Sequence, residues 1–184
     1  TVAEGASVDL SVTAVGALPI SYQWSKGGVE ISGATQSTLT LTDVALSAAG
    51  DYRVAVSNTM GQADSEAITV TVLRPASIAE QPEGGSANLG GTFTLKVVVS
   101  GTEPISYQWH HGGVPIDGAT GSTLRLANLK TADMGSYHVV VSNTVGEQTS
   151  DSVSLSMLPT ITKLTESMTP VKGEDVELSV TAVG

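Results

Sequence analysis

The chain has 184 residues, of which 40% are hydrophobic and 14% charged, and this balance indicates a folded chain of one or two domains. Its net charge of −10 comes from 18 acidic and 8 scattered basic residues, which excludes the cation cluster that binding to nucleic acid or to an anionic membrane requires. The absence of cysteine excludes disulfides, thiolate metal sites and cysteine nucleophiles, and no apolar run reaches the roughly 18 residues that cross a membrane.

The first predicted strand lies within residues 5–16, where Val8, Leu10 and Val12 alternate with polar residues. A second alternating stretch follows in "PISYQW" at residues 19–24, and it predicts that Tyr22 and Trp24 point inward while Ser21 and Gln23 face solvent. Alternation with a period of two is typical of half-buried strands. Further strands are predicted at "STLTL" and "GDYRVAVSN", and Gly or Pro separates the strands at short intervals, as in an all-β sandwich.

The same series of strands then recurs. "PISYQW" returns at residues 104–109, which is 104 − 19 = 85 positions later, and "GDYRVAVSNTMG" returns as "GSYHVVVSNTVG" at the same offset. A third copy begins near the end of the chain, where "GEDVELSVTAVG" repeats the first strand region after 173 − 5 = 168 positions. Repetition at a fixed period indicates tandem units. The predicted domains are residues 1–73, which lack the lead-in to strand A, residues 74–158, and residues 159–184, which hold only strands A to B of a third domain.

The order of these motifs resembles the intermediate set of immunoglobulin domains, in particular the cysteine-free immunoglobulin-like repeats of large bacterial surface proteins. The resemblance implies an all-β fold of tandem immunoglobulin-like antiparallel sandwiches with Greek-key connections. It also implies a core in which a tryptophan on strand C packs beside strands B and F, and a tyrosine closes the E–F corner. Valines then stand where the family has its cysteines. The implied core residues are Val12, Trp24, Tyr52 and Val54 in the first repeat and Val97, Trp109, Tyr137 and Val139 in the second.

The second repeat holds all three histidines, and strand pairing places His110 opposite His138 with both pointing outward. Two such imidazoles can bind Zn²⁺ or Cu²⁺. The first repeat has Ser25 and Arg53 at these places, so we interpret the pair as incidental and predict no metal and no cofactor. Calcium between repeats is a weaker alternative, and its candidate ligands are Glu80, Glu83 and Glu103. Lys96 is expected to face outward, which excludes it from a buried isopeptide bond.

No nucleophile with a base, and no carboxylate pair across a cleft, is evident, so we predict that the chain is not an enzyme. The aromatic residues are all assigned to the core, which leaves no platform for a sugar. The favoured function is a structural segment of an extracellular or cell-surface tandem fibre, filament or stalk. Its partners are neighbouring repeats and other copies of the chain in a polymer.

Three alternatives remain open. The first is an adhesin or accessory module that binds a glycan or protein through loops such as "SNTMG" and "SNTVG". The second is an intracellular muscle-type array. The third concerns the start of the last repeat, which either continues into a longer array or adds strands to another molecule. We favour the longer array, because the apolar face of "VELSV" is left uncovered.

Overall fold

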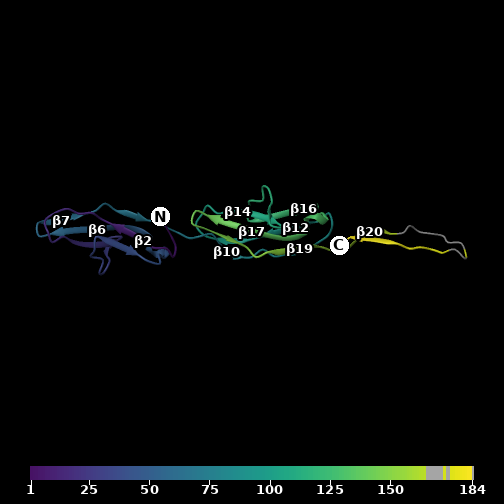
Figure 1. Ribbon diagram of the computed structural model, residues 1–184, viewed down its shortest axis with the longest axis horizontal. Helices are drawn as coiled ribbons and strands as arrows, with labels where there is room; N and C mark the ends of the chain where they lie inside the picture. Colours follow the sequence, from purple (N-terminus) through teal and green to yellow (C-terminus); the bar gives the residue numbers. More distant parts are fainter. Residues whose placement is uncertain (165–171, 173–174, 184) are drawn as a thin grey trace. The chain divides into compact units, whose positions relative to one another are not determined.

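The computed structural model describes residues 1–164, 172 and 175–183 (Figure 1). Strands and two short 3₁₀ turns make up the regular structure of these residues, and no α-helix occurs among them. The chain divides into two compact units: residues 1–75 with 101–103, and residues 76–100 with 104–184. The predicted all-β fold of tandem immunoglobulin-like sandwiches is confirmed. Part of the predicted third domain lies outside the described residues.

The first unit is built around a sheet in which β3 and β6 are central neighbours, with β4 beside β3 and with β7 and β8 beside β6. A separate antiparallel pair, β2 with β5, supplies the opposite layer, and β1 pairs with β9 in parallel. The strands are β1 (Val2–Ala3), β2 (Val8–Ser11), β3 (Ser21–Lys26), β4 (Val29–Glu30), β5 (Thr38–Leu41), β6 (Gly50–Asn58), β7 (Gly61–Asp64), β8 (Ile68–Val70) and β9 (Val72–Leu73), and a 3₁₀ turn covers Leu46–Ala48.

The second unit repeats this plan and adds one strand at its start. Figure 1 shows β14, β17 and β19 in its larger sheet, and β12 pairs with β16 in the other layer. The added strand is β10, which pairs antiparallel with β13. The strands are β10 (Ser77–Glu80), β11 (Gly85–Ala87), β12 (Thr92–Lys96), β13 (Val98–Ser100), β14 (Ser106–His111), β15 (Val114–Pro115), β16 (Thr123–Ala127), β17 (Gly135–Asn143), β18 (Gly146–Thr149) and β19 (Val153–Met157), and a 3₁₀ turn covers Thr131–Asp133.

A last antiparallel pair, β20 (Thr160–Leu164) with β21 (Val180–Val183), follows the second unit's sandwich along the chain. Several apolar side chains of this pair are exposed, among them Ile161, Leu164 and Val180, and so is Leu178, which precedes β21. No second layer covers them within the described residues. The predicted strands A and B of a third repeat correspond to this pair, although the domain boundary itself stays a prediction.

Each unit encloses its own core around one tryptophan. Trp24 is 1% exposed and Trp109 is 0% exposed, and their ring N–H groups donate to backbone carbonyls of Gln36 and Gly121 at 2.9 Å. Satisfying that donor lets the whole indole be buried without an unpaired polar group. The predicted residues Tyr52, Val54, Val97, Tyr137 and Val139 are buried as well.

Val12 is the exception among the predicted core residues, because it is only half-buried while its counterpart Val97 is 2% exposed. The difference follows from a neighbouring strand that the described residues include only for the second unit. In the second unit β10 lies against β13, the strand that continues from Val97, whereas the described residues supply no such neighbour beyond Val12.

The solvent-facing position that we predicted for Gln23 is wrong. Its side-chain amide is half-buried and donates to the carbonyls of Trp24 at 2.9 Å and Ile31 at 2.8 Å, and Gln108 makes the corresponding pair of bonds in the second unit. The side chain therefore fastens the turn after the tryptophan strand. A period-two pattern gives the side of the sheet to which a residue points, but it does not reveal a loop that folds back over that side.

Both tyrosine corners are present. The Tyr52 hydroxyl donates to the Ala48 carbonyl at 2.8 Å, and that of Tyr137 donates to the Asp133 carbonyl at 2.6 Å. Burial raises the pKa of both hydroxyls, with a further contribution from Asp133 at Tyr137, so they remain protonated donors. In the second unit the Asp133 carboxylate also accepts from the Lys130 N–H at 2.7 Å, a bond that Ala48 cannot make in the first.

Replacing Tyr52 with phenylalanine keeps the ring and removes this hydroxyl. We expect the free energy of unfolding of the first unit to fall by about 1 kcal/mol, the usual net contribution of one such hydrogen bond. Urea unfolding followed by Trp24 fluorescence measures the change. Tyr22→Phe is the matched control in the same unit, because none of the hydrogen bonds among the described residues uses its hydroxyl. Equal effects of the two substitutions would contradict the corner assignment.

Candidate functional site

The most distinctive polar cluster is a pair of histidines on β14 and β17. The two strands run antiparallel with His110 directly opposite His138, next to the paired Trp109 and Val139. The imidazole rings are stacked, with their centroids 4.7 Å apart and their planes at 5°. Both side chains are half-buried rather than fully exposed, since each ring covers a face of the other.

The stacked arrangement is not a ready metal site. Nitrogen lone pairs lie in the plane of an imidazole ring, and those of two parallel rings cannot converge on one ion without a ring rotation. No group of three or more His, Asp or Glu side chains suited to a metal gathers in residues 1–164, 172 and 175–183. His110 Nδ1 is buried and has no hydrogen-bond partner in this part of the chain. The absence of a bound metal stays a prediction.

The histidine pair is expected to make the stability of the second unit depend on pH. Burial, and then the neighbouring His110, lower the pKa of His138 below its ordinary value of 6.5, so the folded unit favours the neutral imidazole. Because the unfolded chain then binds more protons than the folded one, the contribution of this group to stability is present above pH 6.5 and lost as pH falls through the folded pKa.

We therefore expect the urea midpoint of the second unit to fall between pH 7 and pH 5, and we expect His138→Gln to reduce that fall. Unfolding curves of both proteins, followed by Trp109 fluorescence in a Trp24→Phe background, measure the effect at about pH 7 and about pH 5. The first unit contains no histidine, so its unfolding curve, followed by Trp24 fluorescence in a Trp109→Phe background, serves as the control. An identical pH response of the two proteins would show that the pair does not titrate on unfolding.

The residue beside each corner tyrosine differs between the two repeats. His111 stacks on Tyr137 with ring centroids 4.4 Å apart, and its Nε2 lies 3.1 Å from the carbonyl oxygen of Met134. In the first unit Lys26 occupies this place, with its ammonium 5.7 Å from the centroid of the Tyr52 ring and hydrogen-bonded to the Ser47 carbonyl. Both arrangements cover the corner tyrosine, which explains these side chains structurally.

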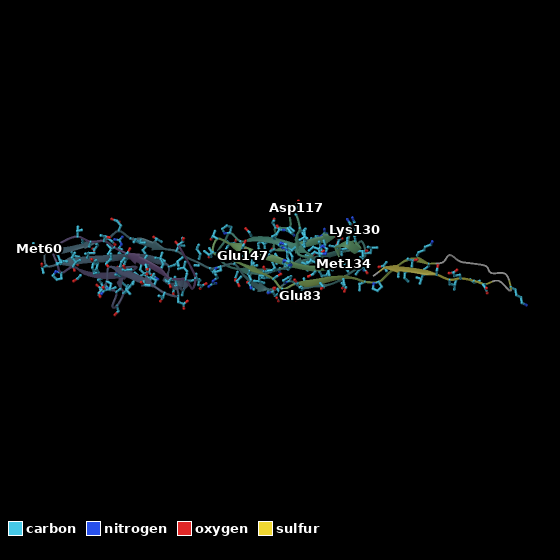
Figure 2. All side chains as sticks on the ribbon, viewed as in Figure 1. Met60, Glu83, Asp117, Lys130, Met134 and Glu147 are labelled. Atoms are coloured by element: carbon cyan, nitrogen blue, oxygen red, sulfur yellow. The ribbon has the colours of Figure 1, made fainter. Side chains whose placement is uncertain are left out.

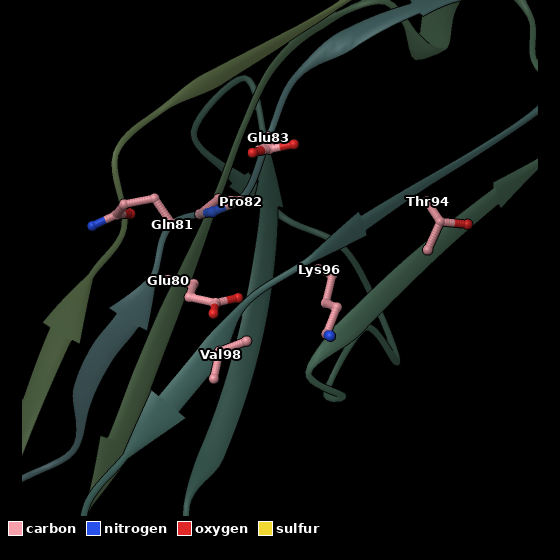
Figure 3. Close-up of a pocket in the computed structure, with 7 residues that line it drawn as sticks. All are labelled: Glu80, Gln81, Pro82, Glu83, Thr94, Lys96 and Val98. Atoms are coloured by element: carbon pink, nitrogen blue, oxygen red, sulfur yellow. The ribbon is translucent and has the colours of Figure 1, made fainter.

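A shallow hollow of about 520 Å³ lies on the second unit beside β10, β12 and β13 (Figure 3). The lining residues are Glu80, Gln81, Pro82, Glu83, Thr94, Lys96 and Val98. Two of the candidate calcium ligands, Glu80 and Glu83, thus share the hollow with the cationic Lys96, and Glu103 does not line it. A lysine beside the carboxylates competes with a metal ion for them, so this arrangement disfavours calcium. Lys96 is exposed, as predicted for a residue that forms no isopeptide bond.

The "SNTMG" and "SNTVG" loops are turns held by their asparagines. Asn58 Oδ1 accepts from the Met60 N–H at 2.9 Å, and Asn143 Oδ1 accepts from the N–H groups of Val145 and Gly146, both at 3.1 Å. Figure 2 shows Met60 at the tip of the β6–β7 hairpin, where its side chain is 84% exposed. The repeated asparagine is therefore explained by turn formation, whereas the exposed methionine is not.

Sequence reasoning missed a serine that both units use in the same way. Ser65 Oγ accepts from the Val54 N–H at 3.0 Å and donates to the Glu66 carbonyl at 2.9 Å, and Ser150 repeats these bonds with Val139 and Asp151. The two serines are separated by 150 − 65 = 85 positions, the offset of the repeats, and this spacing could have identified them as equivalent residues. The bonds fasten the strand segment after the hairpin to the central strand.

The family follows from two matches that coincide with the two sandwiches. Residues 1–72 and residues 76–156 each match the immunoglobulin I-set domain. The chain belongs to the immunoglobulin I-set family. This membership agrees with the tryptophan at the centre of each core and with the tyrosine at each corner.

Several relatives of this I-set chain are long proteins, and the chain spans only a small part of their length. It is 32% identical to mouse hemicentin-2 over 96% of its own length and 4% of that protein, and 30% identical to the muscle M-line assembly protein unc-89 of Caenorhabditis elegans over 98% of its length and 2% of that protein. It is 28% identical to endoglucanase C of Cellulomonas fimi, over 85% of the chain and 15% of that protein.

Solved structures show the same fold. A titin fragment that spans domains I67–I69 superposes with a TM-score of 0.72 at 21% identity, covering 85% of this I-set chain and 61% of the fragment. An E-to-A variant of the same three titin domains gives a TM-score of 0.76 at 22% identity, covering 100% of the chain and 72% of the variant.

Among the residues that the structure describes, none form a helix with the length and apolarity needed to span a bilayer.

Proposed function

We propose that this chain is a non-catalytic structural segment of a tandem immunoglobulin-like array in an extracellular or cell-surface protein of bacterial type. The observation that carries the proposal is that the distinctive residues found in both repeats make contacts that hold the fold together. Each unit uses its tryptophan, corner tyrosine and turn asparagine in the same contacts, and each contact serves the core or a turn. Selection for a repeated scaffold accounts for this pattern without any ligand.

Further features support the location and the source. The acidic surface, with a net charge of −10, favours solubility outside the cell. Relatives are named for cell adhesion and for basement membrane, and one relative is bacterial. The sequence motif "GATxSTL", which is present in both repeats, and the low lysine content also favour a bacterial array. On this proposal the partners are neighbouring repeats, within domains that span residues 1–73, 74–158 and, from residue 159 onward, a third.

Stretching the chain from its two ends tests the mechanical role. We expect two separate unfolding events, each releasing roughly 25 nm of chain, because a unit of about 75 residues extends by about 3.3–3.6 Å per residue. Reducing agent should leave both events unchanged, since the chain contains no cysteine. Extension at low force without discrete events would contradict a mechanical role.

Binding is the second candidate function, and it rests on two observations. Met60 is 84% exposed at a hairpin tip, and the chain is similar to a small part of a protein named endoglucanase C. An accessory module or adhesin would use such a sandwich end to bind a glycan or protein. Screening the chain against a glycan array, with Met60→Ser as the matched variant, tests this: binding that the substitution abolishes would favour the adhesin over the stalk.

An intracellular muscle-type array is the remaining alternative, and the similarity to unc-89 is the observation in its favour. The two settings differ in what surrounds the segment in the full gene product. A secretion signal ahead of the array would support the extracellular proposal, and an array within a cytoskeletal protein would overturn it.

A further inference from the structure

Strand β5 of the first unit has one open edge. It pairs with β2 on one side, and no strand pairs with its other side among the residues that the structure describes. The chain just before β5 lies against the tryptophan of the opposite layer, because the Ala34 carbonyl accepts from the Trp24 N–H at 3.0 Å and the Gln36 carbonyl accepts from its ring N–H at 2.9 Å. That segment therefore cannot cover the edge of β5. An open edge with unpaired N–H and C=O groups is a template for another strand.

The backbone groups of Thr38 and Thr40 point outward at this edge. The Val12 N–H donates to the Ser37 carbonyl at 2.9 Å, and every second residue of an antiparallel ladder turns its groups toward the partner, so Leu39 also bonds with β2. Thr38 and Thr40 alternate with these residues and turn their N–H and C=O groups away from β2. None of the hydrogen bonds within the described part of the chain uses these groups. The edge thus offers free donors and free acceptors in alternation.

The second unit has the same open edge, although its lead-in strand β10 is present. β16 pairs with β12 alone, just as β5 pairs with β2 alone, and the segment before β16 bonds to Trp109 as the segment before β5 bonds to Trp24. The open edge is therefore a feature of the repeat itself.

The two edges differ in charge. β16 carries the exposed Arg125, whereas β5 has Thr40 at that place, since 125 − 85 = 40. A charged side chain is a common protection of an edge strand against pairing with another chain, whereas threonine is uncharged and has a high strand propensity. The short edge strand β4 likewise carries a charge, at Glu30. Of these edges, β5 is the one without a protecting charge.

The apolar side of β5 is also less covered than that of β16. Leu39 is half-buried, whereas its counterpart Leu124 is 8% exposed. A strand added at the open edge brings one of its inward-facing residues beside Leu39. The best partner strand is therefore apolar at that position and uncharged at the positions that face solvent. β5 itself has this pattern, with leucines inward and threonines outward.

We propose that β5 pairs with β5 of a second copy of this chain, antiparallel and with Thr38 opposite the second copy's Thr40. In this register the outward groups form hydrogen-bonded pairs, each of which exchanges both N–H···O bonds, and the two Leu39 side chains meet at the closely spaced pair between them. Threonine pairs across strands are favourable, and no like charges stand opposite each other. β2 and β5 of both copies then form one continuous sheet.

This inference deepens the proposed function, on which its biological meaning rests, by naming another copy of the chain as a lateral partner of the array. Both copies use the same surface, so the contact is isologous and closes as a two-fold dimer. One short strand buries less than the roughly 1,000 Å² of a stable interface, so we expect a weak association with a Kd on the order of 10⁻⁴ M. In a long array, several such contacts act together and strengthen the association.

Exchanging the residues that distinguish the two edges tests the proposal on the full chain by sedimentation velocity. We expect the unmodified chain to dimerise between about 10 μM and about 1 mM. Thr40→Arg should weaken dimerisation at least ~10-fold, because it places two arginines diagonally across the two-fold axis. Arg125→Thr should instead raise the average mass at about 1 mM, because it opens a second uncharged edge. Each variant carries a residue that the other unit has at this place, so both should fold.

The overall charge predicts the opposite results, which separates it from edge pairing as an explanation. The chain has a net charge of −10, so an added arginine reduces the general repulsion between copies and a removed one increases it. Thr59→Arg is the matched control, because Thr59 is exposed between β6 and β7, outside the sheet of β5. Equal effects of Thr40→Arg and Thr59→Arg would overturn the proposal, and so would an unmodified chain that is monomeric at about 1 mM.

Hydrogen exchange along β5 locates the contact. We expect the protection of the Thr38 and Thr40 amides to rise with protein concentration, whereas the Leu39 amide is protected at every concentration by its bond to β2. Dimerisation without a rise at Thr38 and Thr40 would show a contact elsewhere and overturn the proposal. Such a result would leave the two discrete unfolding events, and hence the proposed array, untouched.

Discussion

Replacing Trp109 with alanine should unfold the second unit and leave the first unit folded. Trp109 is 0% exposed, and Trp→Ala changes in cores cost about 3–5 kcal/mol. The substitution also removes the donor to the Gly121 carbonyl, which sits at 2.9 Å. A domain of some 80 residues has a total stability of about 4–12 kcal/mol, so the loss removes much or all of it.

The chain provides its own control for this experiment, because each unit contains one of the two tryptophans. In the Trp109→Ala protein the remaining Trp24 fluorescence reports the first unit alone, and its urea midpoint should be unchanged. Hydrogen exchange at Val139 and Val141 reports the second unit, and their protection should be lost. Trp24→Ala should produce the mirror result. Protection retained at Val139 and Val141 would mean that the second core does not depend on its tryptophan.

The architecture could be predicted because the same pattern of strands occurs twice in the sequence. Alternation of apolar residues defines strands by local chemistry, and the 85-residue offset identifies equivalent positions without any knowledge of contacts. The pairing of His110 with His138 followed from this, because it depends only on which strands are neighbours and on the antiparallel register.

Contacts that depend on loops or on missing neighbours could not be predicted in this way. The amide of Gln23 was assigned to solvent, because alternation cannot show that the following turn brings the Ile31 carbonyl within 2.8 Å. The half-buried state of Val12 depends on a neighbouring strand that the described residues include only for the second unit, so it required the two units to be compared in three dimensions. The stacking of the histidine rings likewise depends on rotamers, which a pattern of residue types does not contain.

The valines at the family's cysteine positions lead to the last prediction. The double substitution Val97→Cys with Val139→Cys should restore a disulfide between two positions that are 2% and 0% exposed. The bridge would close a loop of 139 − 97 = 42 residues, for which chain entropy gives a stabilisation of about 4 kcal/mol. The difference in the free energy of unfolding between the oxidised and reduced forms of the same variant measures this stabilisation, because both forms have lost the same valine contacts.

The equivalent pair in the first unit, Val12→Cys with Val54→Cys, closes a loop of the same length, since 54 − 12 = 42. Its entropic stabilisation should be similar, but its reduction by dithiothreitol should be faster, because Val12 is half-buried where Val97 is buried. Free-thiol titration with time follows both variants. Equal rates would show that the half-buried position of Val12 does not admit a reductant to the core, and failure of either pair to oxidise would contradict its placement at the family's disulfide position.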